Sequence, residues 1–130
     1  MGFRNPSVFS NTIANATIVT TAETVICVTP PLNIPFDNTP ILLVFFCAIS
    51  TGTGTTSAQV RLRRGTTVAG PPLNVLFGAL AAGVANITQG GGYFDVPGLV
   101  AGQQYCMTFT QTGASANGTV FDVSMLAFAL

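Results

Sequence analysis

Short runs of β-forming residues, separated by clusters of turn-forming residues, fill most of this chain. Thr, Val, Ile and Phe recur in the runs, and Gly, Pro, Asn and Ser stand between them. No stretch of ten or more residues combines helical periodicity with helix-forming side chains. The best helical candidate, residues 76–84, contains Gly78 and Gly83 and has no charged face. The chain is therefore expected to fold with β-strands alone.

Eight or so strands are predicted, and their spacing favours an antiparallel sandwich or barrel over a βαβ fold. The clearest is 57–64, where Ala58, Val60 and Leu62 alternate with polar residues. Residues 16–29 form one long strand or a broken pair. An immunoglobulin-like domain would require a tryptophan, which the chain lacks, so a jelly roll fits better. The remaining strands are expected at 40–50, 73–77, 84–89, 93–96, 103–112 and 119–130.

Two of the predicted strands are apolar on both faces. Residues 41–49 are apolar throughout, and residues 119–130 carry large apolar side chains on each side. On the last strand, Phe121 is expected to share a face with Val123 and Met125. A sandwich strand with one solvated face alternates with polar residues, so the second face of these strands is expected to be covered by a partner. That opposite face of the last strand carries Leu126, Phe128 and Leu130.

Charge is scarce: four arginines and four acidic residues are the only charges among 130 residues, and they cancel. A folded chain of this mass exposes about 6,500 Å². This gives one charge per ~800 Å², about the area that one partner buries in a standard interface. The chain is therefore expected to be a subunit of an assembly. Zero net charge predicts no recruitment of nucleic acid, and no apolar run approaches the ~20 residues of a membrane-spanning helix.

The residues needed for catalysis or metal binding are largely missing. There is no histidine or lysine to act as a general base, and the cysteines stand singly in apolar runs, without a CxxC pair. We expect no enzyme activity and no cofactor or metal, with the cysteines as small buried side chains. The exception would be a carboxylate pair or a calcium site, formed if Asp95 and Asp122 lie side by side on neighbouring strands. The cysteines are Cys27, Cys47 and Cys106, and the other carboxylates are Glu23 and Asp37.

Arg61, Arg63 and Arg64 form the only cationic cluster. Such a cluster can bind an anion or nucleic acid, but three arginines neutralise too few phosphates to package a genome. A solvated strand face is a second interpretation. The favoured one is that these arginines form ion pairs with Asp and Glu at a boundary between subunits.

A series of turn and strand motifs gives the chain a family resemblance. The motifs are STGTGTT at 50–56, VRLRRGTT at 60–67, VPG at 96–98, AGQQY at 101–105, QTG at 111–113 and NGTV at 117–120. They resemble those of small phage virion proteins with the jelly roll of the tumour-necrosis-factor (TNF)/C1q type, which is a trimer. The resemblance covers about residues 16–130 and contains no catalytic signature.

The resemblance implies an antiparallel TNF/C1q-like jelly-roll sandwich over residues 16–130, preceded by a short extended N-terminal arm over residues 1–15. It also implies a homotrimer in which one sheet lines the threefold axis through aromatic and aliphatic side chains. The candidate residues for this oligomer interface are Phe45, Phe46, Tyr105, Phe109, Phe121 and Phe128.

The resulting hypothesis is a non-enzymatic virion structural protein. As a homotrimeric decoration or cement protein, it would stabilise a phage head from the capsid surface after synthesis in the host cytoplasm. Its partners would be itself and the major capsid protein or other virion subunits, with no nucleic acid and no membrane. One alternative is a single-jelly-roll capsid shell protein. Another is a fibre-tip module that binds a receptor or glycan, although loops 51–57, 65–72 and 113–118 contain no aromatic residue.

Overall fold

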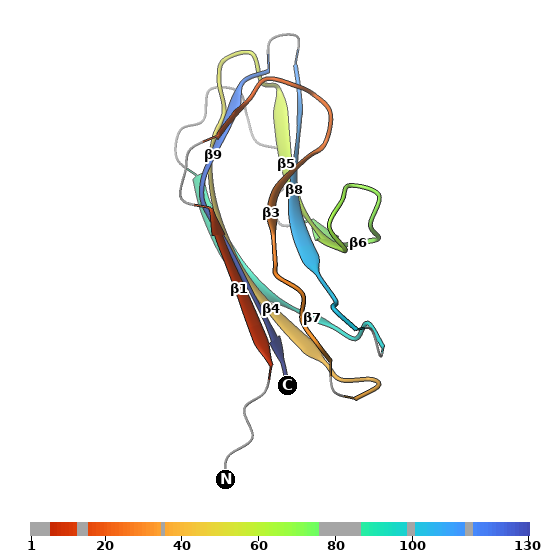
Figure 1. Ribbon diagram of the computed structural model, residues 1–130. Coiled ribbons are helices and arrows are strands. Elements are labelled where there is room, and N and C mark those ends of the chain that lie inside the picture. Colours follow the sequence, from red (N-terminus) through yellow and green to blue (C-terminus); the bar gives the residue numbers. More distant parts are fainter. Residues whose placement is uncertain (1–5, 13–15, 35, 76–86, 99–100, 114–115) are drawn as a thin grey trace.

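Two antiparallel sheets face each other in the computed structural model, which describes residues 6–12, 16–34, 36–75, 87–98, 101–113 and 116–130 (Figure 1). These residues contain no helix, and hence none long and apolar enough to cross a membrane. The predicted all-β jelly roll is confirmed. The strands are β1 (Ser7–Thr12), β2 (Ala16–Ile18), β3 (Thr24–Val28), β4 (Ile41–Ser50), β5 (Ser57–Arg64), β6 (Pro72–Val75), β7 (Ile87–Asp95), β8 (Tyr105–Thr112) and β9 (Gly118–Ala129).

Sheet A has the order β1-β9-β4-β7, with β2 also paired to β9, and sheet B has the order β3-β8-β5-β6. Of the strands that pair, only β5 and β6 are consecutive in the chain. The chain therefore passes repeatedly from one sheet to the other, as in jelly rolls. Figure 1 shows the two layers side by side, with the C-terminal end of β9 at the lower end of the sandwich.

The alternating residues of the long strands build the core between the sheets. As predicted for β5, Ala58, Val60 and Leu62 point inward and are at most 1% exposed. Of the two alternatives for residues 16–29, the structure has the broken pair, because β2 and β3 are separate strands. The other strands contribute buried residues at every second position: Ile41, Leu43, Phe45, Cys47 and Ile49 from β4, Tyr105, Met107 and Phe109 from β8, and Val123, Met125, Ala127 and Ala129 from β9.

The glycine run at 90–92 lies inside a strand, although the sequence suggested an interruption there. Strand β7 continues through it and pairs residue by residue with β4, from Ile41 opposite Asp95 to Ile49 opposite Ile87. The ten-residue β4 supplies backbone partners along this whole length, and these outweigh the weak strand preference of glycine. The predicted strands at 73–77 and 84–89, and the helical candidate at 76–84, fall partly or wholly outside the described residues.

Part of the segment predicted as an extended arm forms β1. It is extended and pairs with β9 of the same chain, from Ser7 opposite Phe128 to Thr12 opposite Val123. Val8 packs against the core, whereas Phe9 on the opposite side is 59% exposed. Three of the six residues of β1, Val8, Phe9 and Thr12, are β-forming, and pairing with β9 holds the strand across the intervening Ser10 and Asn11.

All three cysteines are buried. Burial raises the pKa of Cys47 to about 12 and that of Cys106 to about 11. At neutral pH these two side chains are therefore thiols rather than reactive thiolates, in keeping with the expected role as small buried residues.

Candidate assembly surface

The side of sheet A that faces away from sheet B is largely apolar and exposed. In one row across the sheet, Leu42 of β4 lies between Phe128 of β9 and Phe94 of β7. In the next row, Val44 lies opposite Leu126. Large apolar side chains in adjacent rows form a continuous patch rather than scattered exposed residues. We call this surface the outer face of sheet A and define it by Phe9, Leu42, Val44, Phe46, Phe94, Phe121, Leu126 and Phe128.

This face remains open within a single chain. Val44 is 43% exposed, Phe46 40% and Phe94 65%, even though the first two belong to the central strand of the sheet. The prediction that β4 and β9 are apolar on both faces is therefore confirmed, and the covering of the second face by a partner stays a prediction. Exposed apolar area of this kind marks an interaction surface.

A bulge in β9 changes which way Phe121 points. Phe46 pairs with Ser124 but Ala48 pairs with Phe121, so β9 has one extra residue in this interval. The extra residue is accommodated at Asp122, whose backbone is left-handed with a φ of 53°. The prediction that Phe121 shares the face of Val123 is wrong, because the extra residue shifts the alternation and places Phe121 on the outer face.

Glycines flatten the part of this surface that β7 contributes. Gly92 lies opposite Val44 and Gly90 opposite Phe46 on the same side of the sheet. A Cβ atom at Gly90 would lie 3.4 Å from Cδ2 of Phe46, and one at Gly92 would lie 3.6 Å from Cδ1 of Leu42. The β4 side chains thus lie beside a strip without side chains, which another backbone could approach closely.

The predicted interface residues divide into two groups. Tyr105 and Phe109 are fully buried in the chain's own core, and Phe45 is only 9% exposed there. These three are not accessible to another subunit. Phe46, Phe121 and Phe128 do lie together on the outer face of sheet A.

Sequence reasoning missed Phe9 and Phe94. Phe9 stood in the segment assigned to the arm, and Phe94 follows the glycine run that seemed to interrupt a strand. In the sequence, only the two neighbouring residues Val8 and Phe9 indicated a strand at this position. The cross-strand register with β9 and β4 is what places both phenylalanines on the surface.

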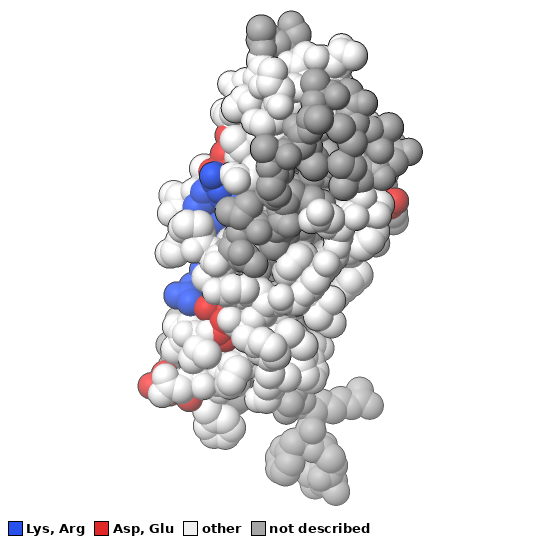
Figure 2. Space-filling model, turned by 180° about the vertical axis from the view of Figure 1, so that it is seen from behind, with Lys and Arg blue, Asp and Glu red and all other residues white. Residues whose placement is uncertain are grey.

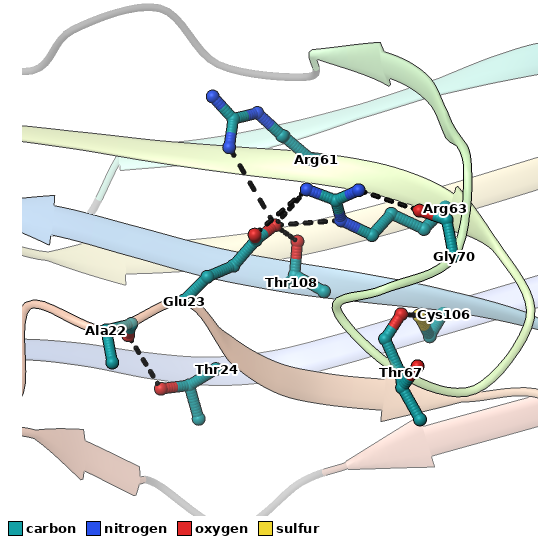
Figure 3. A network of polar contacts seen from close by, with 9 residues as sticks. All are labelled: Ala22, Glu23, Thr24, Arg61, Arg63, Thr67, Gly70, Cys106 and Thr108. Carbon is teal, nitrogen blue, oxygen red and sulfur yellow. Dashed lines mark hydrogen bonds and ion pairs between the residues drawn. The ribbon is translucent and has the colours of Figure 1, made fainter.

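The arginines of β5 find acidic partners within the same chain. Arg63 binds Glu23 through two hydrogen bonds, in which Nε and Nη2 each donate over 2.9 Å (Figure 3). Thr108 donates to the same carboxylate over 2.6 Å, and Arg63 Nη1 donates to the carbonyl of Gly70 over 2.7 Å. Arg61 lies 3.8 Å from Glu23 Oε1. Arg63, which was predicted to form an ion pair with another subunit, therefore has its acidic partner within its own chain.

Arg64 takes part in a second cluster that connects the two sheets. Its Nε donates to Asp95 Oδ2 over 3.0 Å, and the Tyr105 hydroxyl donates to the same oxygen over 2.9 Å. Arg64 and Tyr105 belong to sheet B, whereas Asp95 ends β7 of sheet A. Burial and the neighbouring Asp95 raise the pKa of Tyr105. Asp95 does not meet Asp122, since Asp95 lies opposite Ile41 on one side of β4, whereas Asp122 lies on the other side, between the partners of Phe46 and Ala48.

Seen from behind in Figure 2, most of the charged atoms lie along one side of the molecule, one acidic group lies on the opposite edge, and most of the described surface in this view is uncharged. Among the strands of sheet A, the only charged residues are Asp95, which is 5% exposed, and Asp122, which is exposed at the bulge. The described residues contain no cluster of three or more potential metal ligands.

The Glu23 network makes stability depend on pH. Burial raises the pKa of Glu23, but hydrogen bonds from Thr108 and Arg63 and the charges of Arg63 and Arg61 outweigh it and lower the pKa below its ordinary value. A carboxyl group with a lowered pKa stabilises the fold above its ordinary pKa, and this contribution is lost as the pH falls through the folded-state value. We expect Glu23→Gln to cost about 1–3 kcal/mol at pH 7 and clearly less at pH 3. Urea unfolding at both pH values measures this, and an equal cost at both would contradict it.

No family model matches the chain, and no curated protein matches its sequence. Solved structures do. The TNF protein Eiger from S. frugiperda superposes with a TM-score of 0.56 and 10% identity, over 98% of this chain and 94% of that one. A chain of infectious bursal disease virus, Gx strain, gives 0.53 and 7% identity over 98% of this chain and 37% of its own length. The vertex protein P5 of PRD1 gives 0.42 and 10% identity over 99% of both chains, a likeness too weak to support an argument. The similarity to Eiger shows a TNF-like jelly-roll fold.

Proposed function

We propose that the chain is a non-enzymatic structural subunit of a virion, which assembles as a homotrimer and decorates or cements a phage capsid. The outer face of sheet A carries this proposal. It carries eight large apolar side chains, four of which are exposed: Phe94 at 65%, Phe9 at 59%, Val44 at 43% and Phe46 at 40%. A second copy of the chain is a partner that is always available at the same concentration. Covering the face would remove this apolar area from water.

The number of subunits is proposed from the fold. The sequence resembles trimeric jelly rolls of the TNF/C1q type, and the structure has the TNF-like arrangement of strands. Closed rotational symmetry is also the usual way to satisfy an apolar surface without forming fibres. The virion setting is supported by the resemblance to small phage virion proteins and by the similarity to a chain of a virus structure.

A capsid shell subunit is the second candidate function. The same outer face could hold neighbours in a continuous shell rather than in isolated trimers. The low number of charges supports either assembly equally, because both cover much of the surface.

Sedimentation equilibrium at micromolar concentration, together with negative-stain microscopy, tests the proposal. We expect a species of three times 13.4 kDa and small discrete particles without closed shells. A stable monomer would overturn the proposed assembly, and closed shells formed by this chain alone would replace decoration with the shell function.

A further inference from the structure

A groove of about 250 Å³ lies on the opposite side of the sandwich, on the outer side of sheet B. It runs along β5 and β8, whose outward-facing side chains are paired across the two strands: Gln59 lies opposite Thr110, and Ser57 opposite Thr112. Arg61 closes one end of the groove. The complete lining is Ser57, Ala58, Gln59, Arg61, Thr110, Gln111 and Thr112.

The cation at this groove is incompletely paired. Glu23 already accepts two hydrogen bonds from Arg63 and one from Thr108, so Arg61 is left with a single contact at 3.8 Å. Two arginines facing one carboxylate leave one net positive charge. The side chain of Arg61 is 32% exposed, which leaves guanidinium donors available to a ligand.

The middle of the groove also has unused hydrogen-bonding capacity. The hydroxyl oxygen of Thr110 is buried and has no hydrogen-bond partner, and Gln59 makes no side-chain hydrogen bond to the described residues. At the far end, the hydroxyls of Ser57 and Thr112 lie 2.6 Å apart and satisfy each other. A buried hydroxyl without a partner is costly, and such groups are often completed by a bound molecule.

We infer that this groove binds an acidic sugar, with its carboxylate on Arg61 and its ring hydroxyls on Gln59 and Thr110. A guanidinium recognises a carboxylate through charge-assisted hydrogen bonds. The groove is smaller than the pockets that hold drug-sized ligands, so it suits a single sugar ring. Its lining contains no aromatic residue, and recognition therefore depends on hydrogen bonds and charge rather than on stacking. The groove lies on sheet B, so an interface formed by the outer face of sheet A does not include its lining residues.

A nitrogen-15 NMR titration with methyl glucuronide tests the inference. Methyl glucoside is the matched neutral probe because it differs in having a hydroxymethyl group in place of the carboxylate. We expect saturable shifts of the amides at 57–61 and 110–112 with the glucuronide at millimolar concentration, and at least about tenfold weaker binding of the glucoside. Acetate, a carboxylate without a ring, is also expected to bind at least about tenfold more weakly.

Two variants assign the roles of the residues. Arg61→Gln is expected to weaken glucuronide binding about tenfold or more, whereas Asp37→Asn, distant in sequence and outside the groove lining, leaves it unchanged. Thr110→Val removes a hydroxyl that has no partner in the fold. It is therefore expected to leave the thermal midpoint unchanged or raised while weakening the sugar about threefold or more. A purely structural role for Thr110 would not separate these two readouts.

Several results would overturn the inference. They are the absence of saturable shifts with glucuronide, equal affinity for glucuronide and acetate, or an unchanged affinity in Arg61→Gln. Equal binding of glucoside would exclude the acidic character of the ligand.

Discussion

Phe46→Asp is expected to sediment as a folded monomer of 13.4 kDa at concentrations where the wild-type protein is a trimer. Phe46 lies on the central strand of sheet A and is 40% exposed. Because its side chain is already partly in water in a single chain, the substitution should leave the fold intact. In an assembly that covers the outer face, each introduced carboxylate would be buried without a partner. Replacing a hot-spot residue at the centre of an interface costs about 2–4 kcal/mol of association free energy, and we expect a loss of this size per subunit.

The matched control for this variant is Val68→Asp. Val68 is also 40% exposed, but it lies in the turn between β5 and β6, away from sheet A. The Val68→Asp variant should therefore remain a trimer. If Phe46→Asp remains trimeric, the outer face of sheet A is not the interface. Phe45→Asp would be a poor test, because Phe45 belongs to the core and its replacement would unfold the chain.

Asp95→Ala is expected to produce the largest loss of stability among substitutions of charged residues. The carboxylate accepts hydrogen bonds from Arg64 and from the buried hydroxyl of Tyr105, and it is only 5% exposed. Its removal leaves the tyrosine hydroxyl buried without that acceptor and breaks a polar link between the two sheets. Removing one partner of a buried ion pair lowers the free energy of unfolding by about 3–5 kcal/mol.

Urea unfolding measures this effect, with Asp37→Ala as the control. Asp37 is exposed and accepts a hydrogen bond from the backbone N–H of Asn38, so its loss should cost under about 1 kcal/mol. A double-mutant cycle with Tyr105→Phe sharpens the test. Tyr105→Phe should destabilise the wild-type protein but add little to Asp95→Ala. Independent, additive costs would show that the two residues are not coupled.

The local pattern of the sequence predicted the strands well where side chains alternate strictly. Residues 57–64 became β5 with the expected inward face, because a one-residue shift would bury Arg61 and expose Leu62. The strands with two apolar faces likewise predicted the apolar outer face of sheet A. Both features depend on side chains within one strand, which is the information that a single sequence holds.

What the sequence could not supply depends on contacts between distant residues. Glu23 meets Arg63 across 40 positions, and nothing in the local sequence of either residue selects that partner over Asp37 or Asp122. The bulge at Asp122 is a second example. An αL residue in a strand is rare for any side chain other than glycine, and no turn signal surrounds this one. It changed the orientation of Phe121 and therefore the composition of the outer face.

The position of Asp122 has a consequence for the choice between competing arrangements of the subunits. An apolar surface alone is permissive, since it lets a neighbour slide or rotate at little cost. One carboxylate at the bulge, without a described cation beside it, penalises every docked orientation that buries it unpaired. Only orientations that leave this group at the solvent edge, or meet it with a donor, remain favourable. A single exposed charge can thus select one geometry from the many that the apolar residues would otherwise accept.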